Sequence, residues 1–252
     1  MRDIAAIFKE GQKFLETKYI LPEKLSFIEV NDALLRKLFD HALDLLHYAK
    51  SVHRVGRCMR LAVIKDKTWV GGIVLGSTFP NILARDEALE LRKFTKDYKQ
   101  RGLKSPWSRE NTLYWRALQT VVNHARSFTF PMFQGNGIGT MAEKLLLSEG
   151  VRLWEEKYQD RVYALDNLTD RADSKLFLNN GWQMVGQTKG FSSDPNRIFS
   201  QRLKYKNREQ IRNNIGLSKS KGATQWFVWI KIINPEVLTW VEESIDCKPM
   251  VR

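Results

Sequence analysis

The chain has 252 residues, of which 43% are hydrophobic and 27% are charged, and its formal net charge is +13. This length and composition suit one α/β domain with a substantial core and a charged surface. They argue against a membrane-spanning protein, because no apolar run approaches the roughly 20 residues that cross a bilayer. The charged N-terminus lacks the pattern of a signal peptide. The two cysteines, Cys58 and Cys247, form no CxxC pair, so we expect a cytoplasmic protein.

The positive charge is concentrated in two segments of the chain. Residues 92–126 hold nine Lys or Arg against two acidic residues, and residues 189–231 hold ten against two. Two basic stretches with aromatic residues among them predict a polyanion partner, and we expect DNA. The alternative is a pair of solvated basic surfaces.

The first third of the chain predicts two helices, a strand and a hairpin. Apolar residues at helical spacing indicate a helix at 3–17 and a second helix that begins after Asn31 as its N-cap. Residues 24–30 alternate like a strand. The strand-like runs 58–65 and 68–77, separated by two residues, predict a β-hairpin.

The remaining elements alternate between helix and strand and predict one mixed α/β sheet with helices on both faces. We expect a single domain over 1–252, with a core at about 24–191 and a basic arm or insertion at about 192–222. The expected elements are weak helix and loop at 82–108, helix at 111–125, strand at 127–130, helix at about 138–158, strand at 160–167, a short helix at 171–180 ended by Gly181, strand at 182–190, strand at 224–233, and a helix after Pro235.

A glycine-rich turn stands between the strand at 127–130 and the following helix. Glycines allow a phosphate to approach the unpaired N–H groups at a helix N-terminus without meeting a Cβ atom. The turn is no P-loop, since no Lys-Ser/Thr follows it, and its GxGxG spacing is a poor Rossmann fingerprint. A loop that only turns the chain is the alternative. The candidate anion-binding residues are Gln134, Gly135, Asn136, Gly137, Ile138, Gly139 and Thr140.

The order of elements around this turn resembles the GCN5-related N-acetyltransferase (GNAT) fold. The match covers 128–190, where a Q-x-x-G-x-G turn is followed by a helix, a strand and the run SKLFLNNGW. The resemblance implies a GNAT-like fold and implies that residues 134–140 hold the diphosphate of acetyl-CoA or a related acyl donor. Many members of the family carry a tyrosine in the later helix that protonates the leaving thiolate. Here Phe177 stands at that position and has no proton to give.

A wider resemblance links residues 47–233 to the Mom-type phage DNA-modification proteins and to a related subunit of Druantia anti-phage systems. It rests on the His-Tyr pair before the hairpin, the run VVNHARSFTF, the glycine turn and the run NNGWQMVGQTKGF. The resemblance implies an enzyme that adds an acyl or carbamoylmethyl-type group to the exocyclic amine of adenine in DNA. Such an enzyme needs the base flipped out or single-stranded.

Four residues are candidates for catalysis in this interpretation. An adenine amine is a weak nucleophile and needs a proton acceptor beside it. In the Mom-like context His47 and Tyr48 are the leading candidates, and Asp86 and Asp166 are the next. Alone, His47 is more simply a surface or cap histidine, and the two carboxylates are more simply caps. We expect no metal site, since the four histidines form no HxxH or HxxxH pair.

Three functions are therefore open from the sequence. The first is a Mom-like transferase acting on DNA adenine. The second is an N-acetyltransferase that acts on a protein or a small amine and whose basic surface serves another purpose. The third is a DNA-binding anti-phage protein that keeps the fold but has altered or lost catalysis, as Phe177 suggests.

Overall fold

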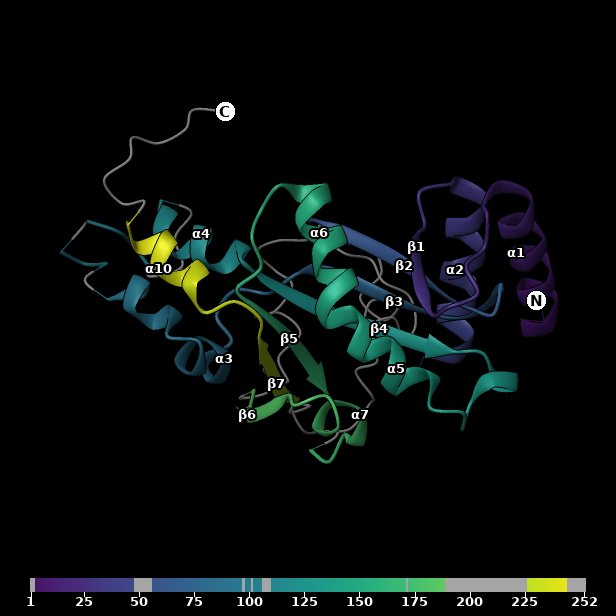
Figure 1. Cartoon of the computed structure of the whole chain (residues 1–252). Helices are drawn as coiled ribbons and strands as arrows, with labels where there is room; N and C mark the ends of the chain where they lie inside the picture. The colour runs from purple at the N-terminus through teal and green to yellow at the C-terminus, as the bar shows by residue number, and fades with distance from the viewer. Residues whose placement is uncertain are drawn as a thin grey trace, which may run out of the picture.

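The computed structural model describes residues 3–47, 56–96, 98–100, 102–105, 110–170, 172–188 and 226–243. Seven strands form one mixed sheet in the order β1-β2-β3-β4-β5-β7-β6 (Figure 1). The strands are β1 (Ser26–Glu29), β2 (Cys58–Lys65), β3 (Thr68–Ser77), β4 (Val121–Thr129), β5 (Ala164–Thr169), β6 (Gln183–Gln187) and β7 (Phe227–Ile232). All neighbouring pairs are antiparallel except β4 and β5. The expected class, a mixed α/β sheet with helices on both faces, is confirmed.

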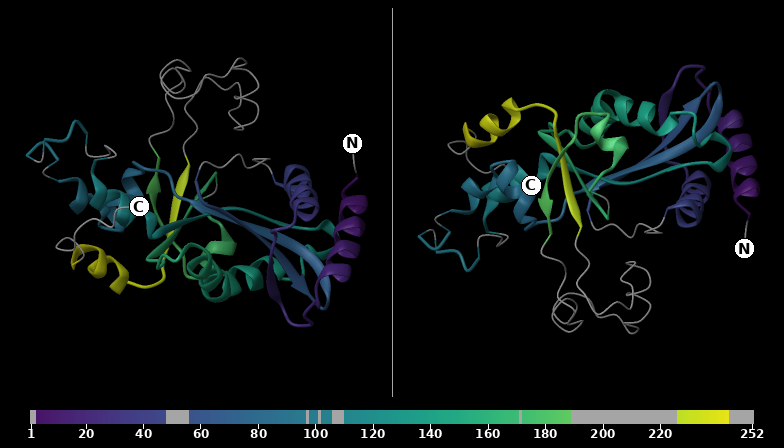
Figure 2. Two further views of the ribbon diagram at one scale, coloured as in Figure 1. Left: turned by 90° about the horizontal axis from the view of Figure 1, so that it is seen from above. Right: turned by 90° about the horizontal axis from the view of Figure 1, so that it is seen from below.

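Helices cover both faces of this sheet (Figure 2). On one face α1 (Ile4–Lys18) and α2 (Ala33–Leu46) bury a core against β2, β3 and β4. On the other face lie α5 (Ile138–Leu145), the π-helical turn η3 (Leu146–Gly150) and α6 (Val151–Tyr158). Their core includes Trp154 and Trp229 and extends to the short helix α7 (Lys175–Leu178). The apolar stripes that periodicity predicts in these helices are the faces that the sheet buries.

A third core lies at the end of the sheet away from the N-terminus (Figure 1). Residues of η1 (Leu91–Thr95), α4 (Thr112–Gln119) and α10 (Glu236–Glu243) contribute to it, and α3 (Leu83–Ala88) contacts η1. Tyr114 is fully buried there. None of the described helices is long and apolar enough to cross a membrane.

Local chemistry explains most of the element boundaries. Asp66 and Lys67 turn the β2–β3 hairpin, both at positive φ (50° and 58°), as a two-residue type I′ turn requires. The N-cap of α2 is Asp32, whose carboxylate accepts hydrogen bonds from the amides of Leu34 and Leu35. The expectation that Asn31 caps this helix was wrong by one residue.

The largest error in the predicted elements lies at 111–125. The helix α4 ends at Gln119, and residues 121–125 begin the central strand β4. Apolar residues in VVNHA fit helical spacing, but the pairing of this segment with β3 and β5 decides its conformation. The helix expected at 138–158 is present but contains the π-helical turn η3. The expected arm at 192–222 lies outside the described residues.

Candidate functional site

The strands β4 and β5 separate in the middle of the sheet. They pair only over Val121–Asn123 and Ala164–Asp166, and beyond this point the Asn167 side-chain amide donates a hydrogen bond to the carbonyl of His124. The register of β4 with β3 shifts here, leaving Ala125 as a bulge. After the bulge, β4 pairs with β3 alone among the described strands. One edge of β4 is therefore open toward the gap.

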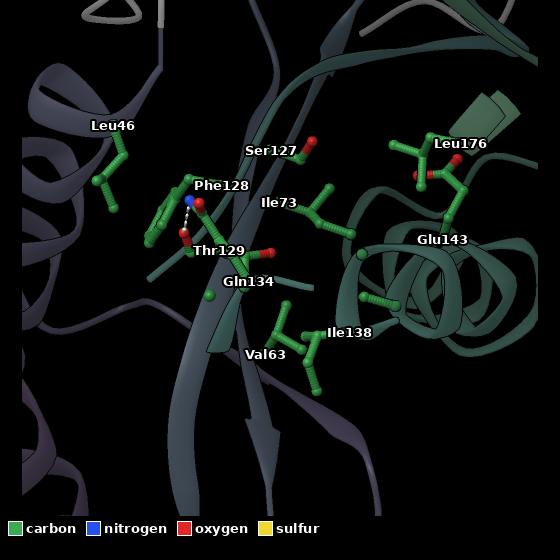
Figure 3. A pocket seen from close by; sticks show the side chains of 14 residues that line it. Leu46, Val63, Ile73, Ser127, Phe128, Thr129, Gln134, Ile138, Glu143 and Leu176 are labelled. Atoms are coloured by element: carbon green, nitrogen blue, oxygen red, sulfur yellow. Dashed lines mark hydrogen bonds between the residues drawn. The ribbon is translucent and has the colours of Figure 1, made fainter. Parts of the chain in front are cut away.

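A cavity of about 290 Å³ lies at this open edge (Figure 3). Strands β2, β3 and β4 line it, together with the end of α2 from one face of the sheet and the start of α5 and Leu176 of α7 from the other face. The lining is mostly aliphatic or glycine, with a few polar groups, which is the usual character of a small-molecule site. The described lining residues are Leu46, Val63, Gly71, Gly72, Ile73, Ser127, Phe128, Thr129, Gln134, Ile138, Gly139, Ala142, Glu143 and Leu176.

The glycine turn joins β4 to α5 at the margin of the cavity. Gly135 and Gly137 have positive φ (84° and 70°), a conformation that glycine adopts without strain. A Cβ atom at either position would meet no heavy atom within 4 Å, so the turn is not plugged by side chains. Residues 134–137 are exposed, and Gln134, Ile138 and Gly139 line the cavity.

The backbone amides of this turn are available for a ligand. Within the described residues, no hydrogen bond uses the N–H groups from Gly135 to Thr140, and the first bonded amide of α5 is that of Met141. The Gln134 side chain donates to the carbonyl of Thr129 (3.1 Å) and so fixes the turn on β4 (Figure 3). Unpaired amides at the positive end of a helix can bind an anion.

Glu143 is the buried acid of the site. It lies one turn into α5, is 1% exposed, and its Oε2 is 3.6 Å from Nδ1 of His124 on β4. Burial raises the pKa of Glu143 to about 8. The Trp182 indole N–H opposes this rise, although it lies outside hydrogen-bond geometry. At neutral pH the carboxyl is therefore mostly protonated.

His47 ends α2 next to Leu46, which lines the cavity. Burial, and then the positive charge of Arg126 on β4, lowers the pKa of His47 to about 4. The imidazole is thus neutral at physiological pH and is a weaker base than an ordinary histidine. Tyr48, its expected partner in catalysis, lies outside the described residues.

Asp86 and Asp166 meet in a buried ionic network outside the cavity lining. Arg85, 0% exposed, binds Asp166 Oδ2 at 3.0 Å and also holds Asp86. Asn123 donates to Asp166 Oδ1 at 2.7 Å, and Tyr114 donates to Asp86 Oδ2 at 3.1 Å. Burial alone would lower the pKa of Arg85, but the two carboxylates raise it above its ordinary value. Both acids therefore serve to neutralise a buried guanidinium in this conformation.

The basic segment 92–126 lies mainly at the other end of the sheet from the glycine turn. Its helices η1 and α4 pack beside α3 and α10, whereas the turn lies toward α1 (Figures 1 and 2). The second basic segment is described only from 226 onward. Of the aromatic residues in the two basic segments, Tyr114 is core and Trp115 packs edge-on against it, while Trp107 and Tyr205 lie outside the described residues. The described residues contain no cluster of three metal-ligating side chains.

Sequence reasoning missed Glu143 and His124. Neither residue is among the candidates that the sequence suggests, and the helix expected at 111–125 places His124 in the wrong type of element. One signal was present: Glu143 lies four residues after Gly139 and three before Leu146, on the stripe that turns inward.

No family model matches the chain, and no curated protein matches it. Among solved structures, the crystal structure of a point mutant of an agmatine N-acetyltransferase in its apo form is similar, at 10% sequence identity and a TM-score of 0.38. The likeness covers 82% of this chain and 98% of that one. Similarity of this degree carries no conclusion about activity.

Proposed function

We propose that the chain is an N-acyltransferase that takes its acyl group from a thioester donor carrying a diphosphate, such as acetyl-CoA. The observation that carries the proposal is the run of unpaired amides from Gly135 to Thr140 beside a cavity at the open edge of β4. The resemblance of this region to GNAT proteins, which includes the same turn, gives the same expectation.

The turn suits a diphosphate for three reasons. Its amides donate hydrogen bonds, its glycines let phosphate oxygens approach, and the chain from Phe130 to Ala142 carries no acidic side chain to repel them. The open edge of β4 offers main-chain groups to an extended, amide-containing ligand, as a sheet edge does to an added strand. The cavity then receives the thioester end.

The acceptor in this proposal is an amine that approaches the same cavity. Attack on a thioester carbonyl requires the amine nitrogen to lose a proton. His47, neutral at physiological pH and adjacent to a cavity-lining residue, is our candidate for the proton acceptor, and Tyr48 stays a prediction beside it. Asp86 and Asp166 are assigned to the Arg85 network and not to the reaction.

Gly139→Val tests the donor site directly. Gly139 has an ordinary helical φ, and an added Cβ would lie 3.8 Å from its nearest neighbour, so the change fills the approach to the amides without straining the backbone. We expect isothermal titration calorimetry with acetyl-CoA to show affinity at least about tenfold lower, since hydrogen bonds to a charged group are each worth about 1.5–3 kcal/mol.

Met141→Val is the matched control, because Met141 is 38% exposed on the same helix and does not line the cavity. It should bind acetyl-CoA like the wild type. Equal affinity in the Gly139→Val variant would remove residues 134–140 from the donor site. Gly137→Val is a weaker test, because its positive φ adds backbone strain to any steric effect.

A second candidate is acyl-type modification of adenine in DNA, which the net charge of +13 and the Mom-like resemblance favour. Mass spectrometry of nucleosides from the DNA of cells that express the chain tests it. A new adenosine adduct that disappears with His47→Ala supports DNA as the acceptor. Unmodified DNA with acetyl transfer to a protein or small amine would assign the acceptor to that class. Salt-sensitive DNA binding with neither activity would favour a binding protein.

A further inference from the structure

One side chain in the cavity stands apart from the others by its chemistry. Of the described residues that line the cavity, Glu143 is the one with a titratable group (Figure 3). The rest are aliphatic, aromatic, hydroxyl or amide side chains and glycines. The carboxyl of Glu143 is 1% exposed, and its Oε1 accepts no hydrogen bond from any described residue.

Such a carboxyl is costly to keep charged. An ionised group buried without compensating hydrogen bonds is strongly disfavoured, so the protein holds it in the neutral form. The rise in the pKa of Glu143 to about 8 has this burial as its largest cause. A neutral carboxyl is a hydrogen-bond donor and an acid, whereas an ionised one only accepts.

Among the described neighbours of Glu143 that the structure places in contact with it, His124 is the basic one. His124 comes from β4, with Nδ1 at 3.6 Å from Oε2. The rings of Phe177 on α7 and of Trp182 lie 5.9 and 6.1 Å from the His124 ring and carry no charge. Leu176 closes the cavity on the same side as Glu143 (Figure 3). Glu143 therefore lies near Phe177, which stands where many GNAT proteins have the tyrosine that protonates the leaving thiolate.

No described tyrosine, cysteine or lysine lines the cavity. The Tyr158 hydroxyl donates to the carbonyl of Cys58, and the Tyr114 hydroxyl donates to Asp86. Neither lines the cavity. Ser127 and Thr129 do line it, but an aliphatic hydroxyl is far too weak an acid to protonate a thiolate.

We propose that Glu143 is the catalytic acid of the acyl transfer and gives its proton to the departing sulfur of the acyl donor. This inference rests on the proposed function. The amine nitrogen forms the new C–N bond, the C–S bond breaks, and the electron pair stays on sulfur. Glu143 passes its proton to that sulfur, which leaves as a thiol. The nitrogen loses one proton to His47, which releases it to solvent, and Glu143 regains one from solvent, so the net change is one proton moved from nitrogen to sulfur.

The closing experiment compares wild type, Glu143→Gln and Glu143→Asp, with acetyl-CoA as donor and hydroxylamine as a small nucleophile that needs no specific acceptor site. The control is Glu156→Gln, because Glu156 lies on α6 with a side chain 58% exposed. Acetyl-CoA affinity is measured by calorimetry and thiol release by a colorimetric assay across pH. Infrared spectroscopy of the protein without ligand reports a protonated carboxyl independently of activity.

We expect Glu143→Gln to keep the wild-type affinity for acetyl-CoA and to lose about 10²–10⁴-fold in kcat, the usual contribution of a general acid. Glu143→Asp should restore part of this loss. The fall of the wild-type rate above about pH 8 should vanish in Glu143→Gln. The wild type should show a protonated-carboxyl band at neutral pH that Glu143→Gln lacks.

Unchanged kcat in Glu143→Gln would overturn the inference, and so would a loss confined to acetyl-CoA affinity, which would make Glu143 a binding residue. If Glu143→Gln fails to fold, the wild-type spectrum decides, and absence of the protonated band at neutral pH would overturn the role. A wild type that neither binds acetyl-CoA nor transfers its acetyl group would refute the proposed function itself, and the inference with it.

Discussion

At the scale of single residues, burial decides which charged groups are structural and which are available for chemistry. Arg85, Asp86 and Asp166 neutralise one another in the interior, and each polar atom of this network has a partner nearby. Glu143 is equally buried but faces a cavity and has no cation other than His124 to pair with among the described residues. A buried carboxyl is thus ion-paired to a guanidinium in one part of the molecule and faces a cavity in another.

Removing Arg85 should destabilise the protein strongly. We expect Arg85→Met to lower the free energy of unfolding by about 3–5 kcal/mol, because it leaves two carboxylates buried without their cation. Urea unfolding followed by circular dichroism measures this. The control is Arg92→Met, whose ion pair with Glu87 is half exposed and should contribute at most about 1 kcal/mol. Equal effects of the two changes would contradict a structural role for the network.

The stability of the protein should depend on pH through Glu143. Its pKa is higher in the folded chain (about 8) than its ordinary value of 4.5, so its stabilising contribution is complete below pH 4.5 and is lost as the pH rises to about 8. Between pH 6.5 and 8 the wild type should lose roughly 1–2 kcal/mol relative to Glu143→Gln, at about 1.4 kcal/mol per pH unit.

The contribution of His47 has the opposite sign and a different range. Its lowered pKa means that stability is lost as the pH falls from 6.5 to about 4. Urea titrations above pH 6.5 therefore isolate Glu143. Parallel stability curves for wild type and Glu143→Gln over that range would show that the carboxyl is ionised in the folded state.

At the scale of elements, two irregularities create the site. The bulge at Ala125 and the early end of β4–β5 pairing open the sheet beside α5. Such bulges are enriched at functional sites. On the opposite face, α1 packs closely on β3 at Gly11, where an added Cβ would lie 2.2 Å from the Trp69 ring.

Gly11→Ala should separate close packing from helix propensity. Alanine favours a helix over glycine by about 1 kcal/mol, but overpacking against Trp69 should cost more, so we expect a net loss of about 1–2 kcal/mol in the free energy of unfolding. Lys9→Ala, exposed on the same helix, should change stability by less than about 0.5 kcal/mol. An unchanged or higher denaturation midpoint for Gly11→Ala would show that α1 is not docked this closely.

At the scale of the whole molecule, the candidate acyl site and the helices η1 and α4 of the first basic segment lie at different ends of the sheet (Figure 1). Exposed lysines of this segment, Lys96, Lys99 and Lys104, flank or follow η1. A polyanion bound there would leave the glycine turn accessible. Donor binding and nucleic-acid binding should therefore be separable by mutation.

The triple change Lys96→Gln, Lys99→Gln and Lys104→Gln should weaken binding of a duplex DNA probe without changing affinity for acetyl-CoA. The slope of log K against log salt should become less steep by up to about 3, since each lost phosphate contact removes about 0.9. Fluorescence anisotropy at several salt concentrations measures it. The matched triple Lys9→Gln, Lys13→Gln and Lys18→Gln on α1 removes the same charge, and an equal effect of both triples would reject a specific basic surface.

Much of this architecture follows from local sequence. Alternating or helical spacing of apolar residues sets β1, the β2–β3 hairpin, α1, α2 and α5, because one face of each must be buried. The glycines at 135, 137 and 139 indicate an accessible helix N-terminus, since positive φ and close approach are properties of the residue itself. His47 was singled out from sequence, but its neutral state depends on Arg126 from another strand.

The remaining features depend on contacts between segments far apart in the chain. Pairing with β3 and β5 makes a strand of residues 121–125, which local propensity places in a helix. Burial of Glu143 beside His124, 19 positions away, raises the pKa of its carboxyl. Ion pairing with Arg85 holds Asp86 and Asp166 outside the cavity lining. The order of residues along the chain is enough to place open backbone amides at residues 135–140. The protonation of Glu143 depends on the fold, because the desolvation of a carboxyl is set by all the groups that pack around it.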